Sequence, residues 1–160
     1  MKYFSSLLVM VLSVLLIACG GKKNEEKQES TKMSDEPVIV NLTGNDQMQY
    51  NLKTIEVPAG SKVKVNLTHI GKMPKTVMGH NFILLKPNTD LAEFATAAMT
   101  AKDSDYIPAS KSDEIIAHTS LVGGGETTSV EFDAPAKGTY KFMCSFPGHY
   151  ATMQGDFIVK

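Results

Sequence analysis

The chain has 160 residues, with 16 lysines, no arginine and 17 acidic residues, which gives a formal net charge of -1 at pH 7. This balance excludes the strongly basic surface that nucleic-acid binding usually needs. Hydrophobic residues make up 42% of the chain, which is enough for one packed domain. The two cysteines could form a disulfide, act as unrelated thiols or include a metal ligand, so their positions decide between these possibilities.

Residues 1–18 have the features of a signal peptide. Lys2 precedes an apolar run over residues 7–18, which is too short to span a bilayer comfortably. The run ends in LIAC at residues 16–19, which resembles the lipobox of bacterial lipoproteins, where the cysteine becomes the lipidated N-terminus. A plain secretory signal and an uncleaved anchor are the alternatives. We therefore expect export and attachment to a bacterial membrane through a lipid on Cys19.

The segment that follows Cys19 predicts a tether. Residues 20–36 read GGKKNEEKQESTKMSDE, with dense charges of both signs and a single apolar residue, Met33. Such a segment cannot bury enough apolar surface to fold. We therefore divide the chain into a signal peptide (1–18), a lipidated cysteine with a flexible tether (19–36) and one folded domain (37–160).

The folded domain shows the alternation of apolar and polar residues that is typical of strands. Val63, Val65 and Leu67 alternate with polar residues, and turn signals rich in glycine and proline separate the apolar segments. One alanine-rich segment, 90–102, has helical spacing instead. The pattern predicts an all-β sandwich with one inserted short helix. The expected strands lie at 38–42, 54–57, 62–67, 81–85, 129–133, 139–144 and 155–159.

Three metal-ligating residue types follow one another near the C-terminus. Cys144, His149 and Met153 are five and four residues apart, in a loop between two expected strands. Thiolate, imidazole and thioether together suit copper in both oxidation states. His80, at the start of another strand, is the natural source of a second imidazole, because a sandwich brings distant strands together. The predicted site has Cys144, His80 and His149 in a plane and Met153 as a long axial contact.

Other interpretations of these residues explain the pattern less well. A single buried cysteine or methionine is most often packing material, so the prediction depends on the ordered combination. Zinc is the rival metal, but thioether is a poor zinc ligand and structural zinc sites usually collect several cysteines. A cysteine hydrolase would need a second orienting group that the sequence does not supply.

Several segments give the chain a denser likeness to one family. From residue 38 to the C-terminus it resembles the azurins, the bacterial blue copper proteins of the cupredoxin family. The segments that carry the likeness are GNDQMQ (44–49), VNL (65–67), VMGHN (77–81), IAHT (116–119), Gly123 with Gly125 and Glu126, SV (129–130), FD (132–133) and FPGH (146–149).

The resemblance adds expectations that spacing does not supply. It implies an eight-stranded Greek-key sandwich, a fifth copper contact from the Gly79 carbonyl, and amides near Asn81 and Phe146 that donate to the Cys144 sulfur. It implies an electron-transfer protein with one copper ion and no enzymatic activity. The alternative function is copper storage, delivery or stress defence. An oxidase or nitrite reductase would need a second copper centre.

The residues expected around the copper site also indicate how partners bind. We expect an apolar docking patch of Met48, Met78, Phe146, Pro147 and Ala151 around the ring edge of His149, suited to transient contacts with redox proteins such as c-type cytochromes, reductases or oxidases. We expect a monomer that faces the periplasm or the cell surface.

Overall fold

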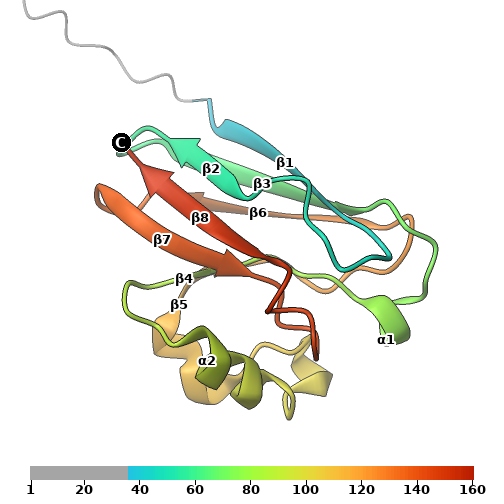
Figure 1. Ribbon diagram of the computed structural model, residues 1–160. Coiled ribbons are helices and arrows are strands. Elements are labelled where there is room, and N and C mark those ends of the chain that lie inside the picture. Colours follow the sequence, from blue (N-terminus) through green and yellow to red (C-terminus); the bar gives the residue numbers. More distant parts are fainter. Residues whose placement is uncertain (1–35) are drawn as a thin grey trace, which may run out of the picture. The chain divides into compact units, whose positions relative to one another are not determined.

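The computed structural model describes residues 36–160, so the predicted signal peptide, Cys19 and the tether up to residue 35 lie outside the described residues. The described part contains eight strands (Figure 1). Seven correspond to the expected strands, and the strand at 115–118 was not among them. The strands are β1 (Val38–Gly44), β2 (Thr54–Val57), β3 (Lys62–His69), β4 (Ile83–Leu85), β5 (Ile115–His118), β6 (Thr127–Asp133), β7 (Gly138–Met143) and β8 (Gln154–Val159).

The strands form two sheets. The first has the order β1-β3-β6, with β1 parallel to β3 and β3 antiparallel to β6. The second has the order β2-β8-β7-β4-β5, in which β2 is parallel to β8 and the other neighbours are antiparallel. Strands far apart in the sequence are therefore neighbours, as in a Greek-key sandwich. The predicted all-β sandwich is confirmed.

The core lies between the two sheets. Alternate residues of β3 point inward, and Val63, Val65 and Leu67 have no exposed surface. Phe142 of β7 and Phe157 of β8 face them from the second sheet and are equally buried. Each such side chain stabilises the fold by about 1.5–3 kcal/mol relative to exposure, so this core holds the loops at the ends of the sheets in place.

A helix covers the outer face of the second sheet. Helix α2 (Leu91–Ala98) begins after Asp90, whose side chain accepts from the backbone amides of Ala92 and Glu93 at 2.8 and 3.0 Å. Phe94 of α2 packs in a cluster with Ile83, Leu85 and Met143, which explains why β4 is buried on both faces. The predicted helix is confirmed over these eight residues.

Three short helical turns were not predicted: α1 (Lys75–Met78) and the 3-10 turns η1 (Lys102–Ser104) and η2 (Ala109–Glu114). Among residues 36–160, no helix has the length and apolar character needed to cross a membrane.

Candidate metal centre

Three of the side chains that the sequence singles out converge at one end of the sandwich. His80 lies just before β4, while Cys144 and His149 lie in the loop between β7 and β8. One nitrogen or sulfur atom of each lies within 4.8 Å of those of the other two. The three residues are 0–2% exposed. Two imidazoles and one thiol therefore share a small space that is almost closed to solvent.

The β7–β8 loop is closed by its own backbone. Met143 pairs with Gln154 at the end of the β7–β8 ladder, and beyond it the Cys144 amide donates to the Met153 carbonyl at 2.9 Å. The amide of Met153 donates to the His149 carbonyl at 2.8 Å. Gly148, with φ of +84°, supplies the left-handed residue that the turn needs. These bonds hold Cys144, His149 and Met153 together at the end of the sheet.

The His80 imidazole has one bonded and one free nitrogen. Its Nε2 lies 2.9 Å from the Asn45 carbonyl, which can only accept, so Nε2 carries the proton and Nδ1 the lone pair. Nδ1 is buried, and among the described residues it is the one buried side-chain nitrogen or oxygen without a hydrogen-bond partner. A buried lone pair without a donor is the arrangement that a metal ion would satisfy.

His80 is also held from behind by packing. A Cβ on Gly44 would lie 2.6 Å from His80 Cδ2, so the ring rests directly against the β1 backbone. The His69 ring stacks on His80, with centroids 4.3 Å apart and planes 19° apart. His69 donates from Nε2 to the Met78 carbonyl and accepts at Nδ1 from the Gly71 amide, at 2.8 and 3.0 Å. Both of its nitrogens are therefore occupied by the main chain.

Gly79 and Met153 lie in the same buried region. The Gly79 carbonyl oxygen is 3.9 Å from the Cys144 sulfur. A Cβ on Gly79 would lie 2.7 Å both from Leu121 Cδ2 and from the Lys75 carbonyl, so only glycine fits this place. Met153 has no exposed surface. The structure thus puts a carbonyl beside the thiol and a buried thioether at the end of the same loop.

Asn81 ties the His80 segment to the Cys144 loop. Its Oδ1 accepts from the Ser145 amide, and its Nδ2 donates to Ser145 Oγ and to the Asp105 carbonyl, all at 2.9 Å. Ser145 Oγ in turn donates to the Tyr106 carbonyl at 2.7 Å. Asp105 and Tyr106 adopt φ of 55° and 61°, an unusual conformation for residues other than glycine. Hydrogen bonds therefore connect three chain segments beside the site, at Asn81, at residues 105–106 and at Ser145.

Comparison with known proteins identifies the family. The sequence model for "copper binding proteins, plastocyanin/azurin family" matches residues 37–160. The chain belongs to this family. It is 44% identical over 126 residues to azurin of Pseudomonas chlororaphis, covering 76% of this chain and 97% of that protein. It is 43% identical over 120 residues to azurin of Alcaligenes faecalis, covering 72% and 93%.

A solved structure shows the same fold. The dithionite-reduced auracyanin of the photosynthetic bacterium Roseiflexus castenholzii matches with a TM-score of 0.69 and 30% identity, covering 77% of this chain and 97% of that one. The expected family and the expected cofactor, copper, are therefore confirmed, and the family together with the histidine and cysteine cluster supports a blue copper electron-transfer protein.

Burial keeps the site neutral before metal enters it. Burial raises the pKa of Cys144 to about 11, and the backbone amides of Asn81 and Phe146 act against this increase. Burial also lowers the pKa of His149 to about 4, with further lowering by His80 and His69. A neutral imidazole can ligate at once, whereas the thiol must release its proton to the solvent when a cation binds. The donors at Asn81 and Phe146 are those that the family resemblance implies.

The residues of the expected docking patch differ in exposure. Ala151 is exposed, Met48, Met78 and Pro147 are half-buried, and Phe146 is only 8% exposed. The Phe146 ring lies 4.7 Å from that of His149, which is itself 2% exposed, so the imidazole presents very little surface. Near Met78 in the sequence, Met73 and Val77 are 38% and 53% exposed, and neither belongs to the expected patch.

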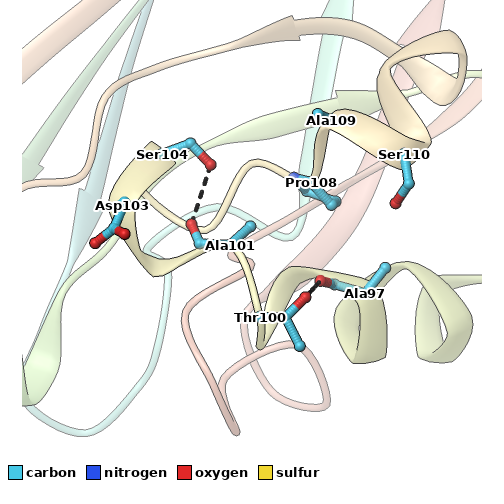
Figure 2. A pocket seen from close by; sticks show the side chains of 8 residues that line it. All are labelled: Ala97, Thr100, Ala101, Asp103, Ser104, Pro108, Ala109 and Ser110. Atoms are coloured by element: carbon cyan, nitrogen blue, oxygen red, sulfur yellow. Dashed lines mark hydrogen bonds between the residues drawn. The ribbon is translucent and has the colours of Figure 1, made fainter.

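A surface hollow elsewhere on the domain lacks the thiol, imidazole and thioether groups of the candidate metal centre. Figure 2 shows it between the end of α2 and the two 3-10 turns. The hydroxyls of Thr100 and Ser104 already donate to the carbonyls of Ala97 and Ala101. Its lining is small and mostly neutral, without histidine, cysteine or methionine: Ala97, Thr100, Ala101, Asp103, Ser104, Pro108, Ala109 and Ser110.

Sequence reasoning missed several residues that support the site. Gly44 and Asn45 were interpreted only as a turn and as part of the family likeness, although Gly44 makes room for the His80 ring and the Asn45 carbonyl fixes its tautomer. Ser145 and Tyr50 were not singled out. The position of Gly44 and Asn45 at the end of a strand was the only available signal for their role. Contacts made by the main chain depend little on residue type, so the sequence does not show which residue such a contact supports.

Proposed function

We propose that this protein is an exported electron carrier in which His80 Nδ1, Cys144 Sγ and His149 Nδ1 hold one copper ion, with Met153 and the Gly79 carbonyl as weaker contacts. The proposal is carried by the free, buried Nδ1 of a histidine, His80, that places a ring nitrogen within 4.8 Å of ligand atoms of Cys144 and His149. A bound copper ion would supply a one-electron couple between Cu(II) and Cu(I). The chain would supply a ligand set that changes little between the two states.

The way the ligands are held favours fast electron transfer. His80 is fixed by the Asn45 carbonyl and by the stacked His69 ring, and Asn81 links its segment to Ser145. Ligands fixed in this way cannot relax far toward the geometry preferred by either oxidation state. Little rearrangement then accompanies the change of charge, and burial excludes water from the site.

Copper storage, delivery or stress defence is the alternative function. A delivery protein must release its metal to an acceptor, whereas here the three candidate ligands are at most 2% exposed and are held by backbone bonds. Two measurements separate these functions. We expect reversible one-electron voltammetry with fast reduction by a c-type cytochrome, and slow loss of copper to a metal-free acceptor. Slow electron exchange with ready copper transfer would contradict the carrier function.

Partners are proposed to dock over the half-buried Met48 and Met78 and the exposed Ala151, near His149. A lysine at Met78 would put a charge into this patch and is expected to slow reduction by the cytochrome at least tenfold. Ile39→Lys provides the control, because Ile39 is 51% exposed near the start of β1, away from the strand end that bears Gly44. Equal slowing by both substitutions would contradict docking at this patch. We propose that the carrier is monomeric.

The membrane anchor is proposed from the sequence LIAC at residues 16–19. Cys19→Ala is expected to abolish incorporation of labelled fatty acid and to release the protein from the membrane fraction. Wild-type protein provides the labelled control. Continued membrane retention of the variant without labelling would contradict the lipid anchor and favour an uncleaved apolar segment. The anchor would hold the domain in the periplasm or at the cell surface.

A further inference from the structure

Tyr50 places a phenol hydroxyl beside the metal centre. It follows the loop after β1, and its backbone forms an isolated bridge with Gly44. The side chain is 4% exposed, and its ring lies 5.8 Å from that of Phe142 in the core. The hydroxyl donates a hydrogen bond to the main-chain carbonyl of Asn81. Tyr50 therefore contacts the segment that directly follows His80.

The hydroxyl keeps its proton. Burial raises the pKa of Tyr50 well above its ordinary value of 10.0, and the neighbouring Cys144 thiol raises it further. A phenol has a single proton to donate, and here the Asn81 carbonyl accepts it.

Asn81 is the residue through which this bond can act on the copper site. Its backbone amide lowers the pKa of Cys144, as a donor directed at the sulfur does, while its side chain is bound to Ser145 and Asp105. The hydrogen bond from Tyr50 restrains the main chain itself, at the Asn81 carbonyl. The neighbouring peptide groups are each held at one atom, the His80 carbonyl by the Val122 amide at 2.8 Å and the Phe82 amide by Thr119 Oγ1 at 3.0 Å. The Tyr50 hydroxyl adds the bond at the Asn81 carbonyl, which restricts the remaining small rotations that would change the distance from the Asn81 amide to the sulfur.

We propose that Tyr50 is a positioning residue of the copper centre, whose hydroxyl fixes the Asn81 main chain so that its amide stays directed at the Cys144 sulfur. The inference rests on the function proposed above. A hydrogen bond to the thiolate withdraws electron density from it, which favours the reduced state and raises the reduction potential. Loss of the Tyr50 hydroxyl should therefore lower the potential.

The test is Tyr50→Phe, which removes one oxygen and keeps the ring in the core. Tyr140→Phe is a matched control, because Tyr140 is 6% exposed and its hydroxyl also donates to a carbonyl, that of Ala136, at 2.7 Å. We expect Tyr50→Phe to lower the reduction potential and to shift the thiolate-to-copper absorption. Tyr140→Phe should leave both unchanged, although both variants lose stability.

Amide hydrogen exchange of the metal-free domain tests the positioning directly. We expect Tyr50→Phe to speed exchange of the Asn81 amide several-fold relative to core amides such as that of Val65, and Tyr140→Phe to leave this ratio unchanged. An unchanged ratio in Tyr50→Phe would overturn the proposal. Faster exchange with an unaltered or raised potential would also overturn it, since the hydroxyl would then be purely structural.

The two readouts separate this inference from the proposed function. A wild-type domain that fails to give a reversible blue copper couple would contradict the electron-carrier function, while the exchange experiment would still decide whether Tyr50 positions Asn81. A normal wild-type couple together with an unaffected Tyr50→Phe variant would overturn only the role of Tyr50.

Discussion

The imidazole of His69 stacks on that of His80 at a centroid distance of 4.3 Å, with both rings fully buried. His69 is not free to act as a ligand, because its two nitrogens bond to the backbone of Met78 and Gly71. It supports the candidate ligand His80 and connects the segment before β4 to the end of β3.

Replacing His69 by phenylalanine tests this supporting role. The ring could still stack, but the Met78 carbonyl and the Gly71 amide would lose their buried partner, which should cost about 2–4 kcal/mol of unfolding free energy. Urea unfolding of the metal-free domain measures the loss. His118→Phe is the control, because His118 is exposed and a surface substitution usually changes stability by less than about 0.5 kcal/mol. Equal stabilities of the two variants would be inconsistent with the role of His69.

Gly44→Ala tests the close contact between β1 and His80. The added methyl would lie 2.6 Å from His80 Cδ2, so the ring must leave its present position beside Cys144 and His149. We expect copper affinity to fall at least tenfold by competition with a chelator. In the control, Gly125→Ala, nothing lies within 4 Å of the new Cβ, but the φ of +80° imposes a backbone cost of about 1–2 kcal/mol. The control should therefore lose stability but keep its copper affinity; a parallel loss of affinity would refute the steric explanation.

The metal-free domain should lose stability in mild acid. Burial lowers the pKa of His149 from 6.5 to about 4, so the unfolded chain binds a proton that the folded state resists. The contribution of His149 is therefore complete above pH 6.5 and falls by about 3 kcal/mol as the pH decreases toward 4. His149→Gln should flatten this part of the pH dependence in urea unfolding. An identical slope in both proteins would show that His149 does not titrate in this way.

Met153→Leu tests the proposed thioether contact to copper. Leucine preserves the apolar volume of a residue with no exposed surface but removes the sulfur donor. We expect the variant to keep its intense absorption and to have a higher reduction potential, because loss of a thioether donor would disfavour Cu(II). Each tenfold change in relative affinity corresponds to about 59 mV in voltammetry. Met143→Leu, at an equally buried methionine of the α2 cluster, should leave the potential unchanged. A wild-type potential in Met153→Leu would exclude the thioether contact.

The sequence predicts a strand most clearly where one face of the strand is buried and the other is exposed. β3 alternates between buried and half-exposed residues, so its period of two is visible in the sequence. β5 has no such alternation: its burial runs from two half-buried residues to one buried and one exposed. It is also only four residues long and directly follows the 3-10 turn η2, so its pairing with β4 depends on contacts that local sequence does not encode.

The site was predictable to the extent that side-chain chemistry defines it. Cys144, His149 and Met153 were identified by residue type and spacing, and Gly79 only by resemblance to the azurins. The Asn45 carbonyl, the Gly44 surface and the Tyr50 hydroxyl act through the main chain or through packing. Such contacts depend on which segments the fold brings together, and a single sequence does not show that.

The absorption spectrum of the purified domain with one equivalent of Cu(II) tests the central claim most directly. If Cys144, His80 and His149 hold the ion as proposed, the wild-type domain will show an intense visible thiolate-to-copper absorption that ascorbate abolishes. The same absorption will be absent from Cys144→Ser. A colourless copper complex of the wild-type domain, or undiminished colour in Cys144→Ser, would contradict the account.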